Sequence, residues 1–260
     1  MAKTNVMDEV SIASLGNASD FGDLTISVRS GGAASSVVRG LAFGGEVDGG
    51  DGTSDVIDYW TFASAGNASD FGDLTDGRKA GMGCVCNGTK ALASGGHDGT
   101  SVVSTIDTIN VSSTGDATNH GDLTVARYGL GGCSHDTYGL FGGGTTGSNS
   151  NVIDYVAIAT TGSATDFGDL TAGRNDVGGN CSDNVRAQWA GGYEAGAANV
   201  IDSVNIASTG NATDFGDLTA ARELSDGFND ATKGCCSGGY TGSNSDVIDY
   251  WVMASPGNAS

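Results

Sequence analysis

Short blocks of alternating apolar and polar residues recur along the whole chain. In the block at 152–158 the first, fifth and seventh positions are apolar (Val152, Val156 and Ile158), and across its copies the fourth and sixth positions are mostly polar or small. Alternation with period two is typical of a β-strand that buries one face. No segment carries an apolar stripe at helical spacing, and glycine and β-branched residues stand where such a stripe would have to lie. The pattern predicts an all-β chain.

Each alternating block carries an aspartate, and these aspartates are evenly spaced. Val-Ile-Asp occurs at 56–58, 152–154, 200–202 and 247–249, with looser copies at 6–8 and 105–107. Successive aspartates lie 50, 49, 47, 48 and 47 residues apart, at Asp8, Asp58, Asp107, Asp154, Asp202 and Asp249. A period of this length indicates a propeller, a solenoid or an array of repeats.

A second block follows each of the first five copies. It reads Asp-Phe-Gly-Asp-Leu-Thr at 20–25, 70–75, 166–171 and 214–219, and Asn-His-Gly-Asp-Leu-Thr at 119–124. Its phenylalanines are Phe21, Phe71, Phe167 and Phe215, and the arginine that follows every block is Arg29, Arg78, Arg127, Arg174 or Arg222. A Gly- and Cys-rich stretch comes next and ends in a Gly pair, as at 95–96.

Each unit of about 48 residues therefore offers four short strands, expected near 79–86, 90–94, 56–62 and 69–74 in the best-defined copies. One four-stranded sheet per repeat is a propeller blade. A β-solenoid is the competing architecture, but its coils repeat in roughly 20 to 30 residues. We expect one five-bladed domain over 1–260, with repeats near 6–55, 56–104, 105–151, 152–199 and 200–246 and a partial sixth copy at 247–260.

The order of these features resembles the Kelch repeat. An arginine opens the unit, two strands close on a Gly pair, and a third strand with an acidic residue follows. Two positions depart from the Kelch pattern. The aromatic after the Gly pair is present only as Tyr193 and Tyr240, and phenylalanine replaces the tryptophan of the fourth strand. The resemblance implies a Kelch-like β-propeller in architecture rather than a close Kelch relative.

A second resemblance is carried by the stretch from Asn211 to Thr219 and by Arg222. Arrays of this type are similar to those in virion structural proteins of tailed bacteriophages, especially cyanobacterial and marine ones. The resemblance implies a non-enzymatic capsid decoration, fibre or tail appendage, made in the host cytoplasm and located in the virion. Its implied partners are other virion proteins and a glycan or receptor on the host surface, and a homo-oligomer is compatible with it.

Closure of the ring is uneven, because six Val-Ile-Asp strands accompany five Asp-Phe-Gly blocks. We expect the N-terminal strands to complete the last blade, since an open sheet edge invites aggregation. The alternative is that the native chain continues past Ser260.

The net charge of the chain limits the classes of molecule that it can bind. The net charge of -20, from 31 acidic and 11 basic side chains, repels nucleic-acid phosphates and anionic lipids. The start of the chain has no apolar stretch of signal-peptide length, and nowhere do about 18 apolar residues follow one another. We expect neither nucleic-acid binding nor membrane insertion, and we expect the six cysteines to be free thiols rather than a disulfide framework.

The recurring carboxylates and aromatics have architectural interpretations. Asp-Phe-Gly resembles the magnesium-binding triad of protein kinases, but it recurs in register and no nucleotide loop accompanies it. We expect its phenylalanine to pack between sheets and its aspartate to cap a turn. The aspartate of Val-Ile-Asp lies on an apolar face, where burial requires a partner, and the repeated arginine is the obvious one.

Candidate chemistry beyond this network is sparse. The turn with Asp48, Asp51 and Asp55 has carboxylate spacing that suits calcium, but it lacks the EF-hand register. The three histidines occupy different repeat positions and do not pair with cysteines at zinc spacing. We therefore predict no enzyme, no catalytic residues and no cofactor.

The leading hypothesis is a virion structural protein that displays variable loops on a rigid scaffold. The loops after the Gly pairs differ most between copies, as at 46–55, 97–104 and 194–199, and binding residues are usually found on such loops. The alternative is a glycan- or protein-binding, lectin-like module that is unrelated to virions. A propeller enzyme would need a unique cluster of carboxylates or metal ligands near the axis.

Overall fold

All regular secondary structure in the computed structural model, which describes residues 3–11, 17–48 and 52–260, is β-strand. The strands form antiparallel sheets: four of four strands, one of three and one of two. Within the part of the chain that the structure describes, no helix is long and apolar enough to cross a membrane.

The blades follow one another along the chain. Blade one is β3 (Gly32–Ser35), β4 (Arg39–Glu46), β5 (Thr53–Thr61) and β6 (Ser69–Arg78). Blade two is β7 (Gly83–Cys86), β8 (Lys90–Ser94), β9 (Thr105–Asn110) and β10 (Thr118–Asp122). Blade three is β11 (Tyr128–Ser134), β12 (Tyr138–Thr145), β13 (Val152–Ala157) and β14 (Thr165–Asp169). Blade four is β15 (Gly179–Ser182), β16 (Arg186–Ala190), β17 (Val200–Asn205) and β18 (Thr213–Asp217). Blade five is β19 (Asp226–Asn229), β20 (Lys233–Ser237) and β21 (Ile248–Val252).

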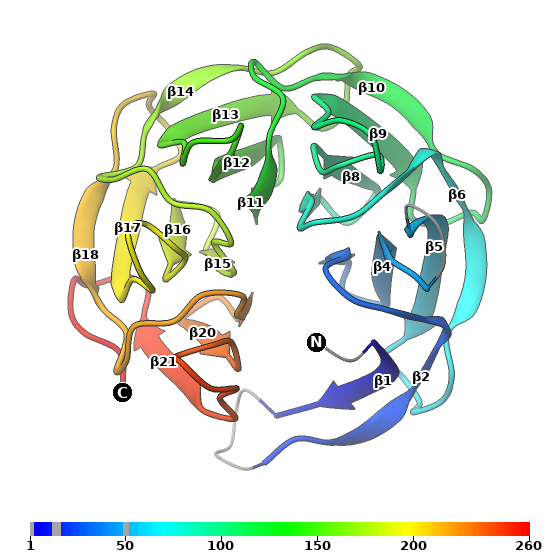
Figure 1. Cartoon of the computed structure of the whole chain (residues 1–260), viewed down its shortest axis with the longest axis horizontal. Coiled ribbons are helices and arrows are strands. Elements are labelled where there is room, and N and C mark those ends of the chain that lie inside the picture. The colour runs from blue at the N-terminus through cyan, green and yellow to red at the C-terminus, as the bar shows by residue number, and fades with distance from the viewer. Residues whose placement is uncertain (1–2, 12–16, 49–51) are drawn as a thin grey trace.

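The blades stand side by side around a common axis (Figure 1). In each of them the strand after the repeated arginine is innermost, and the strands then follow in chain order towards the outside. The remaining sector, between blade five and blade one, holds the N-terminal ribbon of β1 (Thr4–Glu9) and β2 (Ser19–Val28). The five-bladed, all-β propeller predicted from the sequence is confirmed.

A bulge in the Asp-Phe-Gly strand repeats in every copy. In blade three Ile153 lies opposite Gly168 and Asp154 opposite Asp166, so Phe167 is an extra residue without an opposite partner. The same shift isolates Phe21, Phe71, His120 and Phe215. A bulge re-aims the extra side chain, and here it accompanies burial of the aromatic ring, since all five are at most 7% exposed.

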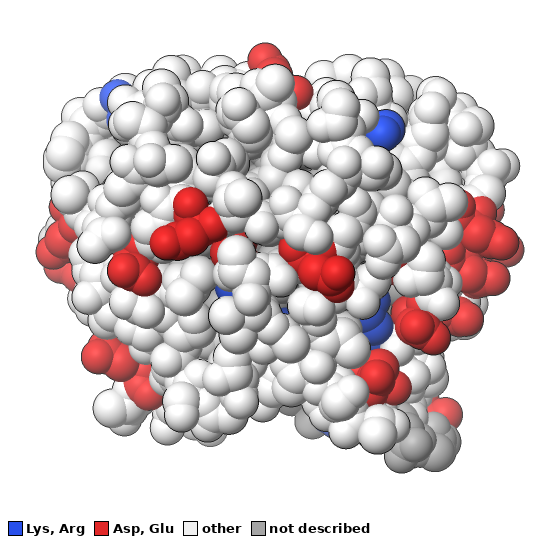
Figure 2. Space-filling model, turned by 90° about the horizontal axis from the view of Figure 1, so that it is seen from above, with Lys and Arg blue, Asp and Glu red and all other residues white. Residues whose placement is uncertain are grey.

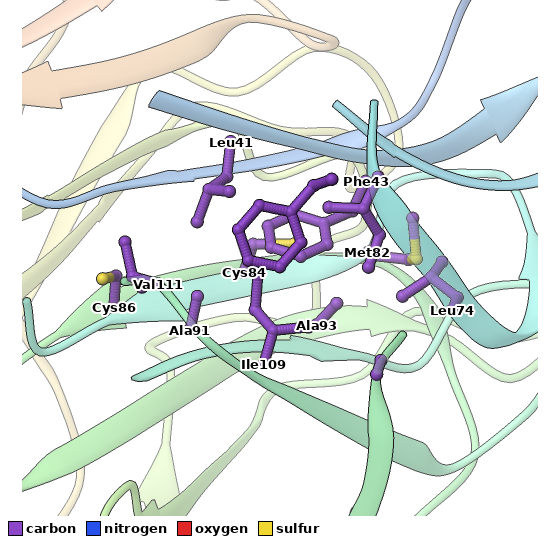
Figure 3. Packing of buried hydrophobic residues seen from close by; sticks show 13 residues of the cluster. Leu41, Phe43, Leu74, Met82, Cys84, Cys86, Ala91, Ala93, Ile109 and Val111 are labelled. Atoms are coloured by element: carbon purple, nitrogen blue, oxygen red, sulfur yellow. The ribbon is translucent and has the colours of Figure 1, made fainter. Parts of the chain in front are cut away.

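The apolar core lies between the blades rather than within one of them. Figure 3 shows Leu41 and Phe43 of β4 packed against Cys84 of β7 and Ile109 of β9. Three further clusters occupy the interfaces between blades two and three, three and four, and four and five. A four-stranded sheet cannot bury its faces alone, so each blade depends on its neighbours.

Blade five corrects the expectation about ring closure. The described N-terminal strands do not extend it, because β2 pairs with β1 in the register that other third and fourth strands use. Instead, Ser260 exchanges two backbone hydrogen bonds with Tyr250 of β21, at 3.1 and 2.9 Å. In blade four the equivalent pair is Ser203 of β17 and Thr213, the first residue of the fourth strand β18. The fourth strand of blade five is thus represented by one residue.

Individual strands agree with the sequence prediction to different degrees. The strand expected at 90–94 is β8 without change, whereas the one expected at 79–86 begins only at Gly83, because 79–82 form the turn that enters it. All six cysteines are free and buried, as expected.

Candidate functional site

The repeated aspartate, threonine and arginine meet at the blade interfaces. At the interface between blades two and three, Thr124 donates its backbone N–H and its hydroxyl to the carboxylate of Asp154, at 3.2 and 2.6 Å. Arg127 donates to the same carboxylate at 2.9 Å and to the carbonyl oxygen of Phe141 at 3.0 Å. Both charged side chains are completely buried. We call this arrangement the clasp.

The clasp recurs at three other interfaces. Arg78 pairs with Asp107, Arg174 pairs with Asp202 at 2.6 Å, and Arg222 pairs with Asp249 at 2.9 Å. Thr75, Thr171 and Thr219 donate to the same three carboxylates. Burial lowers the pKa of Arg174 and raises the pKa of Asp202, while the ion pair opposes both changes. Desolvation costs roughly several kcal/mol per ion. Good geometry and the additional hydrogen bonds to the carboxylate offset this cost in the buried pair.

Arg29 is the exception, and it corrects the expected pairing with Asp58. Thr25 still donates to Asp58, but Arg29 pairs with Glu46 at 2.6 Å. Three residues lie between Thr25 and Arg29, whereas two lie between the threonine and the arginine in the other copies. A shift of one residue in an extended strand turns a side chain to the opposite face. Arg29 is therefore partly exposed and lines the central cavity instead.

The Asp-Phe-Gly block also carries the turn expected of it. Asp70 and Asp166 accept hydrogen bonds from the backbone N–H groups of Gly72 and Gly168, respectively. The glycine lies against the next blade: a Cβ at Gly168 would overlap the carbonyl oxygen of Gly210. That neighbouring loop in turn uses Asn211 to accept a bond from the N–H of Asp169, at 3.1 Å. Asn67 and Asn258 accept the same kind of bond from the N–H groups of Asp23 and Asp217, so each of these asparagines links two neighbouring sheets.

The calcium candidate is only partly described. Asp48 accepts a hydrogen bond from Lys3 Nζ at 2.7 Å, Asp55 lies exposed on β5, and Asp51 falls outside the described residues. Among the residues with described positions, no three His, Cys, Asp or Glu side chains are grouped to hold a metal ion. His120 replaces the bulged phenylalanine, and its Nε2 lies 3.0 Å from the carbonyl oxygen of Ala157.

A cavity of about 800 Å³ lies on the axis of the propeller and is lined by the innermost strands and the turns that lead into them. Its polar side chains include Asp176, Asn180 and Asp226. Burial, and secondarily the charge of Glu223, raise the pKa of Asp176 to about 6. The surrounding protein likewise raises the pKa of Asp226 to about 6, although its side chain remains open to solvent within the cavity. The Oδ1 atom of Asn180 is buried without a hydrogen-bond partner.

A collar of strained backbone lines this cavity. Ser30, Ala80, Asp176 and Leu224 have φ between 49° and 69°, and Gly129 has the same conformation at the equivalent position of blade three. Left-handed conformations cost non-glycine residues about 1–2 kcal/mol each. Hydrogen bonds link the turns in sequence, from the N–H of Gly81 to Ser30, for example, at 3.0 Å. Strained residues persist only where contacts with the surrounding structure hold their backbone conformation in place.

The variable loops begin beside the same collar. Arg29 forms a β-bridge to Glu46, Lys79 to His97 and Asn175 to Tyr193, and each second member starts or adjoins a loop that varies between repeats. Neighbouring loops also touch, since the side-chain amide of Asn149 donates to the carbonyl oxygens of Tyr193 and Glu194 at 2.9 and 2.8 Å. The cavity and these loops therefore form one candidate binding face.

Sequence reasoning missed the cavity residues, although one signal was present. In blade five, Asp226 of β19 lies opposite the residue that precedes the Gly pair. The residue at this register position is glycine in the other four blades: Gly32, Gly83, Gly131 and Gly179. A departure from an otherwise uniform glycine position indicates a local role for the side chain. Asp176 carried no comparable signal, because its position differs in every repeat.

No family model matches the chain, and no curated protein matches it.

Proposed function

We propose that this chain is a non-enzymatic structural protein of a tailed-phage virion whose propeller holds a binding face. The observation that carries the proposal is the clasp. Four interfaces use the same buried Asp, Arg and Thr, so the most unusual polar groups of the chain serve architecture. The virion location is inferred from the resemblance of the repeat to virion arrays, and the proposed partners are other virion proteins.

The arrangement of the loops supports a display role. Sequence variation is concentrated in loops at the cavity end of the propeller, while the interfaces beneath them are nearly uniform. A rigid frame with variable loops is a common design for recognition. A receptor or glycan on the host surface is the ligand that a fibre or tail appendage would meet there.

Purified particles test this proposal. Mass spectrometry should find the chain in phage particles banded twice on density gradients, at a fixed ratio to the major capsid protein. Antibodies against the chain should label one part of the particle in electron micrographs. Recovery of the chain only from the soluble fraction of infected cells would contradict a virion role.

The cavity favours a second candidate, a lectin-like module. Carboxylates and a buried amide oxygen without a partner offer hydrogen-bond acceptors to sugar hydroxyls. A glycan array should then show specific binding by the isolated chain, and Asp226→Gly, which restores the glycine of the other repeats, should abolish it. An array without specific binding would reject this alternative.

A further inference from the structure

The turn between β7 and β8 contains the only Asn-Gly pair in the sequence, Asn87-Gly88. Asparagine side chains are chemically labile in proteins, and the usual reaction runs through the main-chain nitrogen of the next residue. That nitrogen is most accessible when the next residue is glycine, because no Cβ obstructs its approach to the side-chain amide. The pair is therefore the position of the chain that is most open to this chemistry.

The turn holds the nitrogen of Gly88 only weakly. Gly88 is exposed and has φ of +87°, and nothing lies within 4 Å of a Cβ added to it. Its N–H donates to the sulfur of Cys86, at 3.2 Å, and sulfur is a weak acceptor. The nitrogen that has to attack thus lies at the surface, in a weak hydrogen bond.

The side chain of Asn87 is folded back over the same peptide. Its Oδ1 accepts hydrogen bonds from the N–H of Thr89, at 3.1 Å, and from the N–H of Lys90, at 2.9 Å. The hydroxyl of Thr89 donates to this oxygen as well, at 2.9 Å. A bond to the N–H two residues on brings a side chain across the intervening peptide, and donors on a carbonyl oxygen stabilise the negative charge that develops there during attack. The turn therefore brings Cγ of Asn87 towards the nitrogen of Gly88 and makes it a better electrophile.

Aspartate already fits the equivalent turn of blade five. There Asp230 follows the first strand directly and accepts hydrogen bonds from the N–H and hydroxyl of Thr232 and the N–H of Lys233, at 2.6, 2.8 and 2.7 Å. The bonds from Lys233 and Thr232 lower the pKa of Asp230, so this turn favours a charged carboxylate. An aspartate at 87 would lose the bond that Asn87 Nδ2 donates to the carbonyl oxygen of Asp136, at 3.3 Å. The fold is otherwise prepared for the acid.

We propose that Asn87 deamidates spontaneously in the folded chain and that ordinary aspartate is the main product. The nitrogen of Gly88 gives up its proton and bonds to Cγ of Asn87, the bond from Cγ to Nδ2 breaks, and Nδ2 leaves with that proton as ammonia. Water then opens the cyclic imide at Cγ, the carbon whose oxygen faces the donors of Thr89 and Lys90, and this restores the ordinary main chain. In sum, an amide and one water become a carboxylate and ammonium, and the chain gains one negative charge.

The fold disfavours the other product of the imide. Attack of water at the main-chain carbonyl of Asn87 gives isoaspartate, which adds one carbon to the main chain inside the turn. The turn closes with the N–H of Asn87 on the carbonyl oxygen of Lys90, at 3.1 Å, and with Cys86 opposite Ala91. Hairpin register depends on the length of the loop, so an extra backbone atom disturbs both contacts. An unfolded peptide carries neither constraint.

Peptide mapping of the aged protein tests the proposal. The full chain is incubated in mildly alkaline buffer, digested and analysed by mass spectrometry, and isoaspartate is measured with an isoaspartyl methyltransferase. We expect a gain of about one dalton at Asn87, with most of the product coeluting with the synthetic aspartate peptide. Residues 80–96 as an isolated peptide should give a larger share of isoaspartate than the folded chain.

Two variants and an internal control make the test specific. Gly88→Ala should slow the reaction at least about tenfold, because a Cβ obstructs the nitrogen and disfavours the left-handed turn. Thr89→Val removes one donor to Oδ1, so it should slow the reaction and raise the share of isoaspartate. Asn184 lies in the equivalent turn of blade four but precedes Val185, and it should stay amidated.

Three outcomes would overturn the proposal: an Asn87 that stays amidated as Asn184 does, a rate that Gly88→Ala leaves unchanged, and isoaspartate as the main product in the folded chain. The reaction needs only the folded chain and water, so none of these outcomes depends on a virion location.

Discussion

At the scale of single residues, the clasp at Asp154 gives the sharpest prediction. Arg127→Met leaves a buried carboxylate without its cation, and breaking a buried pair in this way costs about 3–5 kcal/mol. We expect that loss in the free energy of unfolding measured with urea. The double variant Arg127→Met with Asp154→Leu should regain most of it, because it buries no charge. Arg29→Met should cost much less, since Arg29 lies partly exposed against Glu46. Equal losses at Arg127 and Arg29 would contradict this account of the clasp.

The cavity carboxylate Asp176 should make stability depend on pH. Its pKa in the folded chain is about 6, above the ordinary value of 3.8, so the folded state holds its proton more tightly than the unfolded state. The resulting stabilisation is complete below pH 4 and is lost as the pH rises through 6. Asp176→Asn should therefore stabilise the chain at pH 7, by on the order of 1–2 kcal/mol, and should gain little at pH 4.

Asp98 provides a control of opposite sign. Hydrogen bonds from the backbone N–H groups of Ser101 and Thr100 lower the pKa of Asp98. Its contribution is present above its ordinary pKa and is lost as the pH falls below that value. Asp98→Asn should therefore destabilise the chain at pH 7, and by less at pH 3. Urea titrations of both variants from pH 3 to 8 make the comparison, and a gain from Asp176→Asn that does not vary with pH would rule out the titration of this group.

At the scale of elements, the glycine of the Asp-Phe-Gly block controls how one blade meets the next. Gly168 has φ of +150°, and a Cβ there would overlap the carbonyl group of Gly210 in the following blade. Gly168→Ala should lower the free energy of unfolding by about 2–4 kcal/mol, from backbone strain together with the displaced loop. Gly196→Ala is the matched control, since nothing lies within 4 Å of its added Cβ. A chain that tolerates both changes equally would contradict the role of this contact.

The elements also show what sequence reasoning reaches. Periodicity predicted the strands and the blades because one pattern of buried and exposed positions recurs, and it identified the carboxylate and the arginine that meet at Asp154. It could not place Arg29. The extra residue after Thr25 moves the arginine to the other face of its strand, and this effect cannot be predicted until the register of the strand is known. It also missed the cavity at Asp176 and Asp226. That site is assembled from positions at which repeats differ, and a search for similarity passes over them.

At the scale of the whole molecule, the clasps explain how so acidic a chain stays folded. The net charge is -20, and Figure 2 shows acidic side chains gathered in patches on the outer wall, with few basic side chains among them. The ion pairs that join the blades lie inside, shielded from water. Salt should therefore screen the repulsion on the wall while leaving the clasps unchanged, because buried pairs are screened much less than exposed charges.

This separation predicts that salt stabilises the fold. The Debye length falls from about 30 Å at 0.01 M salt to about 10 Å at 0.1 M, so repulsion between exposed carboxylates on the wall is screened over this range. The thermal midpoint should rise by several degrees over that range and then level off. Asp73 is a suitable probe, since burial and the charges of Asp55, Asp116 and Asp70 raise its pKa. Asp73→Asn should raise the midpoint at 0.01 M salt and lose this advantage at 0.5 M. A midpoint that falls as salt is added would show that exposed ion pairs, rather than repulsion on the wall, dominate the electrostatics of the fold.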